Sequence, residues 1–540
     1  MKTFIASSDT KHWNRAVPII IAGCMLLLLP GCFIPKLRGP SASQSLPESF
    51  FLPDTYSGET GAENSAKIST IDFFEDPNLL GLIDQALVGN QELKILAENI
   101  QIANNEILRR RGAYLPFLSF GSGAGLSKLS TYTPAGADLS QIVAPTGGSF
   151  PNPLPDFLVA GNISWQIDIW RQLRNARDSQ GLRYLGTVDG RNYVVTRLVA
   201  EIAENYYALM ALDKQLETLD RTIALQEQSL EIAKARKLAA RDTELAVQRF
   251  EAEVRKNQSQ KLIIRQDIVE AENQINFLAG RFPQPVQRMS VDFINLKLHP
   301  LEVGVPSQLL QNRPDIRQAE RELQAAGLDI RVARAGFYPR VFITAGVGYE
   351  AFNAKYLLKS PESLLYNAAG NLVAPVINRS AIKADYMNAN ARQLQALYDY
   401  QRTILNAFTE VVNRVSKVQN YSESIEIKKQ QLESLESAVE VAGNLFQNAR
   451  VEYIDVLFAQ RDRNEARMVI IDTKREQLSA IVNTYQALGG GWQNRPRVTA
   501  VTPVEAPPPP VDIEVVPIAP NNNDAPQPPP NNEVPLPALN

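Results

Sequence analysis

The chain of 540 residues carries 55 basic and 58 acidic side chains, so its net charge is −3 at pH 7 and it lacks the basic footprint of a nucleic-acid-binding protein. Two histidines and two cysteines exclude most catalytic triads, imidazole acid–base pairs and zinc sites. Carboxylates are plentiful, but no pair stands out as an acid–base centre. We therefore expect no enzymatic activity, no cofactor and no metal site.

The first 31 residues predict an export signal. Lys2, Lys11 and Arg15 charge the start, residues 16–29 form a short apolar core, and small residues precede Cys32. The core of about 14 residues is too short for a spanning helix, which needs roughly 20. We therefore interpret residues 1–31 as a signal peptide and residues 32–75 as an extended segment that begins the mature chain.

Cys32 is the predicted site of lipidation. Residues 29–32 (Leu-Pro-Gly-Cys) resemble the bacterial lipobox, in which the cysteine is acylated, although proline is an imperfect fit at the second place. Residues 21–24 match the lipobox better, but Cys24 would follow an apolar core of only about eight residues. An ordinary cleaved signal without lipid is the third reading. Both cysteines lie in this region, so the folded body has no disulfide.

The chain repeats itself. Residues 90–125 and 313–348 align without a gap at an offset of 223. In both copies an amphipathic stretch ends at a proline, Pro116 or Pro339, and a glycine-rich, β-prone run follows. Proline ends a helix, so each copy predicts a helix followed by a strand. A duplicated unit of this kind builds symmetric architecture. The identical pairs are Gln101/Gln324, Ala103/Ala326, Ile107/Ile330, Arg111/Arg334, Pro116/Pro339, Gly123/Gly346 and Gly125/Gly348.

Four strands are expected, over residues 117–130, 157–169, 341–350 and 364–377. Residues 131–155 are rich in proline and glycine and predict a long loop after the first strand, with a shorter counterpart at 351–362. No run of 18 apolar residues follows the leader, so no transmembrane helix is expected. Four strands cannot close a membrane barrel, since the smallest type has eight. If the strands form a barrel, several chains must share it.

Two long stretches without proline, residues 156–281 and 376–494, predict long helices. Apolar residues recur every seven positions with a second set between them, which is the seam of a left-handed coiled coil. A helix of about 65 residues would reach about 100 Å. Each stretch must turn back, and residues 239–243 and 449–453, 209 positions apart, are the candidate turns. A solvated dimeric coiled coil is the alternative. The heptad positions are Ile202, Leu209, Leu216, Ile223 and Leu230, and Leu397, Ile404, Val411 and Val418.

Residues 499–540 hold 13 prolines and no basic residue. This composition predicts a disordered or polyproline-type tail, either a spacer or a ligand for another protein.

With these elements placed, the chain resembles the TolC-like outer membrane efflux family, in the lipoprotein branch that serves resistance-nodulation-division pumps. The resemblance covers about residues 40–495. Its most specific motif is residues 303–316, Val-Gly-Val-Pro-Ser-Gln-Leu-Leu-Gln-Asn-Arg-Pro-Asp-Ile. Residues 164–170 look like the family's passage from strand to helix, and residues 485–492 are similar to its terminal signature. The division that follows is a first repeat at 76–281, a linker at 282–312 and a second repeat at 313–495.

The resemblance implies a homotrimer. Three chains, each mostly helical with four membrane strands, would form one 12-stranded β-barrel continued by a long periplasmic α-helical barrel. It implies a lipid-anchored outer membrane channel that passively exports small molecules, joined to an inner membrane resistance-nodulation-division pump through a periplasmic adaptor. The six methionines and two histidines form no ladder of soft ligands, which disfavours copper or silver as cargo.

The chain departs from the family's pattern at three glycines. Ala240 and Ala449 stand at the two tips, and Arg171 follows Trp170. Alanine in a left-handed tip costs roughly 1 kcal/mol or forces a helical turn, so the fit of the tips to a partner is open.

The closed end of the tube is the candidate site. By resemblance, Glu452 narrows the aperture, with Asp455 one turn away. Carboxylates gathered around a threefold axis repel one another, at about 1 kcal/mol per pair at 4 Å in water. We expect Arg241 or Arg450 to hold them through bonds to a neighbouring helix, with Asp242 in the same turn. A solvated turn whose charges do nothing is the alternative.

Three other functions are weighed against the efflux channel. A periplasmic coiled-coil tether would explain the lipid and the helices but not the duplicated strands. A channel for another secretion system would share the architecture. An exported enzyme is disfavoured by the scarcity of histidine and cysteine.

Overall fold

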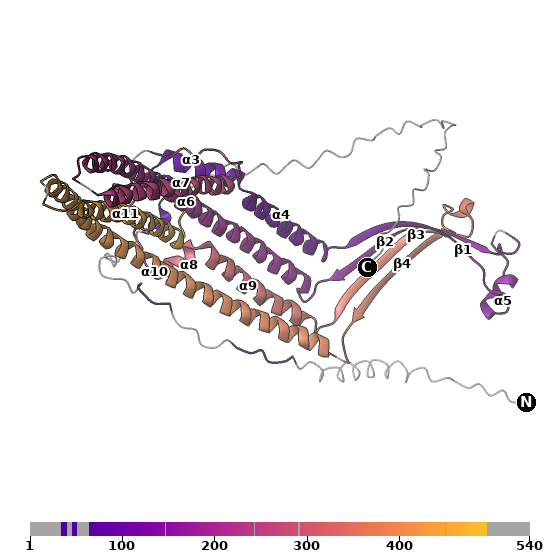
Figure 1. The fold of residues 1–540 in the computed structure, drawn as a ribbon. Helices are drawn as coiled ribbons and strands as arrows, with labels where there is room; N and C mark the ends of the chain where they lie inside the picture. Colours follow the sequence, from indigo (N-terminus) through magenta and orange to yellow (C-terminus); the bar gives the residue numbers. More distant parts are fainter. Residues whose placement is uncertain are drawn as a thin grey trace, which may run out of the picture. The chain divides into compact units, whose positions relative to one another are not determined.

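The computed structural model describes residues 34–39, 46–50, 64–145, 147–241, 243–289, 292–377, 379–448 and 450–493. The signal peptide, Cys32, Asp242, Ala449 and the tail at 499–540 lie outside these residues. The described part consists of long helices and one four-stranded sheet (Figure 1).

The helices and strands follow the duplicated order helix, strand, strand, long helix, shorter helix. None of the helices in the described part is long and apolar enough to cross a membrane. α2 (Thr70–Phe74) precedes the first repeat, which holds α3 (Pro77–Gly89), α4 (Gln91–Gly112), β1 (Phe117–Ser127), α5 (Pro134–Gln141), β2 (Leu154–Ile167), α6 (Gln172–Leu238) and α7 (Glu244–Leu278). The second holds α8 (Leu309–Asn312), α9 (Pro314–Ala335), β3 (Arg340–Ala351), β4 (Leu364–Val373), α10 (Ser380–Gln447) and α11 (Tyr453–Ala487), and short 3₁₀ turns occur at Ser65–Lys67, Phe293–Asn295, Pro306–Gln308 and Ala354–Tyr356.

Local chemistry sets the helix ends. The Asn90 side chain accepts a hydrogen bond from the Leu93 N–H and so caps α4. α9 begins at Pro314, because the N–H that proline lacks would have no partner within the first turn of a helix. Pro116 and Pro339 each stand just before a strand, at the helix-to-strand boundaries expected from the repeat.

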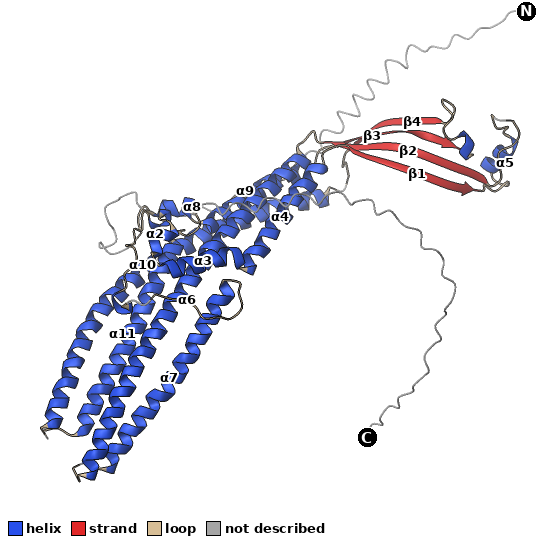
Figure 2. Cartoon of the chain, turned by 90° about the horizontal axis from the view of Figure 1, so that it is seen from above, coloured by secondary structure: helices blue, strands red, loops and turns tan. Residues whose placement is uncertain are grey.

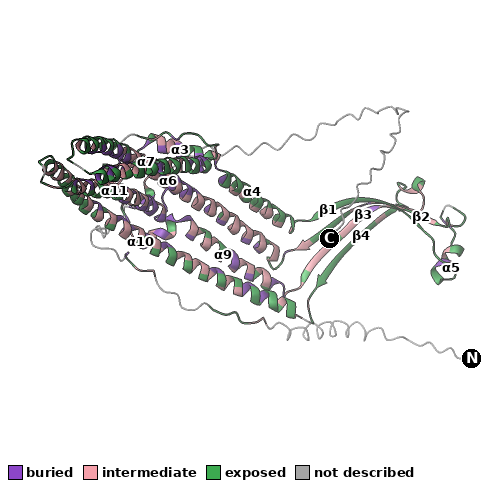
Figure 3. Cartoon of the chain, viewed as in Figure 1, coloured by how far each residue is buried: buried purple, intermediate pink, exposed green. Residues whose placement is uncertain are grey.

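The sheet is antiparallel throughout, in the order β1-β2-β3-β4. The strands lie within a few residues of the predicted ranges. One difference is α5, inside the segment expected to be a loop. Thr133 caps this short helix by accepting a hydrogen bond from the Gly136 N–H, and Pro134 supplies its first turn. The edge strands β1 and β4 are almost wholly exposed (Figure 3).

The long helices of the two repeats are closely matched in length. α6 has 67 residues and α10 has 68, while α7 and α11 have 35 each. Each long helix and its shorter follower form a hairpin, and both hairpins turn at the end of the helices far from the sheet (Figure 2). The predicted heptad residues of α6 are mostly buried, so the seam packs against other helices of the same chain.

The largest core lies where α3 and the C-terminal half of α11 meet the middle of α6. Phe73 stacks on Tyr485 with ring centroids 4.1 Å apart. The Tyr206 hydroxyl donates to Asp76 at 2.5 Å, and burial with this contact raises the pKa of Tyr206. Aromatic packing therefore ties the start of the first repeat to the end of the second.

Arg313, in the most specific sequence motif, is a buried cation that joins three helices. Its guanidinium contacts the Asp315 carboxylate at 2.7 Å, Glu410 of α10 at 2.9 Å and the Ala487 carbonyl oxygen at the end of α11 at 2.7 Å. Burial opposes the charged form of Arg313, but the two carboxylates outweigh it and raise its pKa. The motif thus fastens the start of α9 to the second hairpin.

Candidate functional site

The turn between α6 and α7 is a tight helix stop built without glycine. Ala240 has a left-handed backbone, with φ of 52°. The Arg241 N–H donates to the Arg236 carbonyl oxygen and the Ala240 N–H donates to that of Lys237, both at 2.9 Å. This is the pattern that glycine usually completes. Ala240 therefore has the left-handed backbone conformation that glycine usually adopts, at a cost in backbone strain of the order of 1 kcal/mol.

The turn between α10 and α11 is closed by an equivalent hydrogen bond. The Arg450 N–H donates to the Leu445 carbonyl oxygen at 2.9 Å, the same six-residue closure. α11 then begins at Tyr453, and the Glu452 N–H donates to the Asp455 carboxylate at 3.3 Å. Asp455 thus has a local role, since it satisfies a free N–H at the helix start.

The two hairpins touch at their tips. The Arg236 guanidinium lies over the Phe446 ring, 4.3 Å from its centroid, and joins α6 to α10. The rings of Phe250 and Tyr453 lie 5.8 Å apart and join α7 to α11. A small apolar cluster lies beside them. This tip cluster consists of Leu230, Ala233, Val247, Phe250 and Leu457, with Tyr453 and Ile454 at its edge.

The predicted aperture residues are brought to one end but do not bond to one another within the chain. Arg241, Arg450, Glu452 and Asp455 are all exposed. Among the described residues, neither arginine forms an ion pair with either carboxylate. Asp242 lies outside the described residues. The expected contacts run between neighbouring chains, so the closing role of these charges stays a prediction.

Beyond the tips, polar pairs join α6 to α11 beside the apolar packing between these helices. The Gln215 amide donates to Asp472 at 2.9 Å, and the Thr222 hydroxyl donates to Asn464 at 3.2 Å. Side chains of this kind exchange their partners for water at little net free energy. The first hairpin is therefore joined to the second by apolar packing and polar pairs between α6 and α11, and by a separate apolar contact at the tip.

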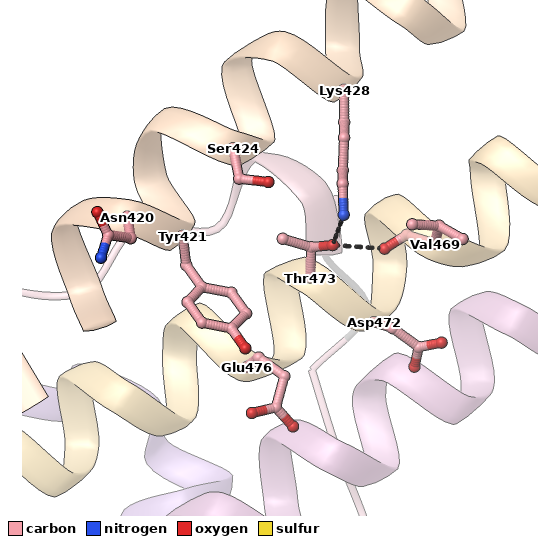
Figure 4. Close-up of a pocket in the computed structure, with 8 residues that line it drawn as sticks. All are labelled: Asn420, Tyr421, Ser424, Lys428, Val469, Asp472, Thr473 and Glu476. Carbon is pink, nitrogen blue, oxygen red and sulfur yellow. Dashed lines mark hydrogen bonds between the residues drawn. The ribbon is translucent and has the colours of Figure 1, made fainter. Parts of the chain in front are cut away.

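A groove of about 550 Å³ lies between α10 and α11 (Figure 4). The Lys428 ammonium donates to the Thr473 hydroxyl at 2.7 Å, and the Tyr421 ring faces Glu476. Lys417 bonds to Glu476 at 2.7 Å and lowers the pKa of that carboxyl. On a buried part of α11, burial together with Lys429 and Lys297 lowers the pKa of Lys474 to about 8. These groups suit a hydrated wall rather than a reactive centre.

The N-terminal segment runs along α10. Ile34 packs against Phe337 and Tyr386 near the sheet. The Asn390 side chain accepts from the Arg38 N–H at 3.0 Å and donates to its carbonyl oxygen at 3.2 Å. Further along, Phe50 stacks on Phe408 at 5.3 Å. Within the described residues, 34–39 thus contact α10 near the sheet and Phe50 contacts it near its middle.

Sequence reasoning missed Arg236, Phe446 and Phe250 as tip residues. Arg236 and Phe446 are 210 positions apart, and neither stands out from its neighbours in the sequence. One signal was available, since both lie within one helical turn of the predicted turns and a duplicated hairpin brings its two tips to one end.

The chain belongs to the family described as outer membrane efflux protein, which matches residues 82–281 and 305–490. It is therefore a channel protein of the outer membrane, in a family of efflux channels rather than enzymes, and the predicted family and function are confirmed.

The curated relatives are similar over almost their whole length. The cation efflux system protein CusC of Escherichia coli O6:H1 is 27% identical over 471 residues, which cover 87% of this chain and 98% of the relative. The probable outer membrane lipoprotein SilC of Salmonella typhimurium is 25% identical over 475 residues, 88% of this chain and 97% of the relative. The pyoverdine export outer membrane protein OpmQ of Pseudomonas aeruginosa is 28% identical over 425 residues, 78% and 87%.

Solved structures share the fold. The CusC crystal structure matches with a TM-score of 0.73 at 24% identity, over 85% of this chain and 100% of that one. The open state of the Neisseria gonorrhoeae MtrE channel matches with a TM-score of 0.73 at 22% identity, over 85% and 98%. The expected fold, mostly helical with four antiparallel strands, is confirmed.

Proposed function

We propose that three copies of the chain form a 12-stranded β-barrel in the outer membrane, continued by a periplasmic tube of helices. The barrel would be the passive exit for small molecules that an inner membrane resistance-nodulation-division pump delivers through a periplasmic adaptor. The observation that carries this proposal is the sheet itself. Its order is β1-β2-β3-β4, so within the described chain β1 and β4 are edges that pair on one side only.

Open sheet edges do not occur within lipid, because unpaired backbone groups cannot be hydrated there. Pairing β4 of one copy with β1 of the next removes every edge once the ring closes. Three copies give 12 strands, within the range of known barrels. The cargo is proposed only as small molecules, since relatives of similar identity are named for cations and for pyoverdine.

We expect the purified full chain in detergent to run as a trimer in native mass spectrometry and to give single-channel conductance in a planar bilayer. Crosslinking in cells should capture a periplasmic adaptor on the same trimer. A folded monomer without conductance would contradict the assembly. Trimeric pores captured with a different class of partner would point to another secretion system.

Cys32 is proposed as the acylated residue. It precedes by two positions Ile34, which packs beside the sheet end of α10. Cys24 precedes Ile34 by ten positions. An acyl chain on Cys32 would therefore start close to the membrane strands, and several chains anchor stably where one does not.

Radiolabelled palmitate should enter the wild type and be lost in the Cys32→Ser variant. Cys24→Ser is the matched control and should keep the label. Label that survives Cys32→Ser and disappears in Cys24→Ser would assign the other lipobox. No label in the wild type would indicate a signal cleaved without lipidation.

The tip charges are proposed to keep the resting aperture narrow. Arg241 and Arg450 are exposed and have no carboxylate partner among the described residues of their own chain, so they are available to a neighbouring copy. Replacing both with alanine should raise basal conductance. Glu452→Ala should weaken block by divalent cations at the same mouth, because it removes three carboxylates from one opening. Exposed Arg402 of α10, paired with Asp399, is the control site. If the tip variants conduct and block like the wild type, these residues are only surface.

A further inference from the structure

Basic residues gather where the helices meet the sheet. All four helix–strand junctions lie at one end of the sheet, opposite the loop that carries α5 (Figure 2). The N-terminal segment joins them, because Ile34 packs on α9 and α10 there. This junction holds 13 basic and five acidic residues, whereas the whole chain has 55 and 58. We call its basic residues the collar, and its segments are 34–39, 106–116, 164–178, 329–340 and 374–385.

The opposite end of the sheet shows no such excess. Residues 127–157 and 350–364, which form the two loops and the adjoining strand ends, hold three basic and four acidic residues. The charge is therefore a property of one end of the sheet rather than of the sheet as a whole.

Much of the collar has no counter-ion in the part of the chain that the structure describes. Some members are paired, such as Arg174 with Asp168 at 3.3 Å. Several others are exposed and form no ion pair among the residues that the structure describes. These exposed cations are Lys36, Arg111, Arg331, Arg334, Arg340 and Lys383.

Arg171 adds a second, independent observation. Its backbone is left-handed, with φ of 56°, a region in which a non-glycine residue is strained. Its side chain is 60% exposed and reaches Asp178 only at 3.8 Å. Neither burial nor a strong contact within the chain explains a long cation at this strained position.

Two tryptophans lie at the same junction. The Trp165 indole N–H donates to the Tyr114 carbonyl oxygen, and that of Trp170 donates to the Pro339 carbonyl oxygen. Both rings are partly exposed, and Trp170 stacks on Tyr338 at 4.7 Å. Tryptophan is enriched at the boundary between hydrocarbon and water, so the collar lies at the level of lipid headgroups if the sheet spans the membrane.

We propose that the collar binds the phosphate groups of anionic phospholipids in the leaflet at the helical end of the sheet. The inference rests on the proposed function, which places the sheet in a bilayer. Unpaired arginines bind phosphate oxygens through charge-assisted hydrogen bonds, and each cation near an anionic bilayer contributes about fivefold in affinity. The lipid phosphates thereby act as counter-ions of the exposed basic residues of the collar.

The test measures lipid preference at the junction itself. The full chain is reconstituted in bilayers of phosphatidylcholine that contain brominated phosphatidylglycerol, whose bromine quenches nearby indoles such as Trp165 and Trp170. The wild type should be quenched more by brominated phosphatidylglycerol than by brominated phosphatidylcholine. The Arg334→Gln/Arg340→Gln variant should lower that preference at least about fivefold.

The control is Arg249→Gln/Arg265→Gln, which removes two exposed arginines of α7 that likewise lack an ion pair in the described chain. It should keep the wild-type preference. An equal preference for both lipids in the wild type, an unchanged preference in the collar variant, or an equal loss in the control would each overturn the proposal. Inorganic phosphate should lower the preference for brominated phosphatidylglycerol no more than chloride does at the same ionic strength. A larger loss of that preference with phosphate than with chloride would assign the surface to the free anion instead.

Conductance separates this proposal from the one it rests on. In bilayers of phosphatidylcholine alone, both double variants should conduct like the wild type. If the wild type itself forms no pores, the proposed assembly fails, whatever the lipid preference. If it conducts normally and shows no preference for the anionic lipid, only the collar proposal fails.

Discussion

Replacing Arg313 with methionine should lower the free energy of unfolding of the helical part by about 3–5 kcal/mol. The substitution removes the buried cation and leaves the Asp315 and Glu410 carboxylates without their partner. The Arg313 side chain is only 6% exposed and contacts Asp315, Glu410 and the Ala487 carbonyl oxygen at once. Arg313→Lys should recover only part of the loss, since an ammonium cannot reproduce the planar fork. The measurement is thermal unfolding of the detergent-solubilised protein followed by helical circular dichroism.

The control for Arg313 is Arg402→Gln. Arg402 pairs with Asp399 at 3.0 Å, but its side chain is 72% exposed, so its loss should change stability by less than about 1 kcal/mol. Equal shifts in the unfolding temperature for the two variants would show that the buried contacts of Arg313 contribute nothing special.

Gly348→Ala should disrupt the sheet, whereas Gly125→Ala, at the equivalent position of the first repeat, should be tolerated. A Cβ at Gly348 would lie 2.4 Å from the Val159 carbonyl oxygen and 2.6 Å from the Ala160 Cβ. At Gly125 the nearest atom would be the Asp156 Cβ at 3.8 Å, an ordinary contact. Forcing β2 and β3 apart costs on the order of 1–3 kcal/mol in each copy.

The yield of trimer in membranes, measured by native mass spectrometry after extraction, distinguishes the two glycine variants. We expect Gly348→Ala to lower it strongly and Gly125→Ala to leave it near the wild-type value. Matching yields would mean that the sheet relaxes around the added methyl group.

The sequence alone does not predict this difference between the two equivalent glycines. The duplication predicted helix, proline and strand in both copies, because proline excludes helix locally and Gly-rich alternation is itself a local signal. Whether a glycine is crowded depends on its neighbours across the sheet. Gly348 lies in a central strand and Gly125 in an edge strand, and only the register reveals the close approach.

The long helices and their turns were predictable for the same local reason, since heptads repeat within one element. The contact of Arg236 with Phe446 joins two hairpins, and the Asn390 clamp on Arg38 spans 352 positions. Neither leaves a pattern in a single sequence. The helix α5 was missed because its eight residues sit among glycines and prolines that favour a loop, and Thr133 outweighs them by capping the first turn.

The equal arms of the two hairpins constrain how this chain can change its length. α7 and α11 both contain 35 residues, which is five heptads. The first residues of the two helices are 209 positions apart in the sequence, and so are their last residues. Removing one heptad from both arms of a single hairpin would shorten that hairpin by about 10 Å and separate Phe250 from Tyr453. Changes in length that keep the tips in contact are therefore expected in both arms of both hairpins, in units of seven residues. The repetition of the hairpin thus also sets the steps in which the length of the helical part can change.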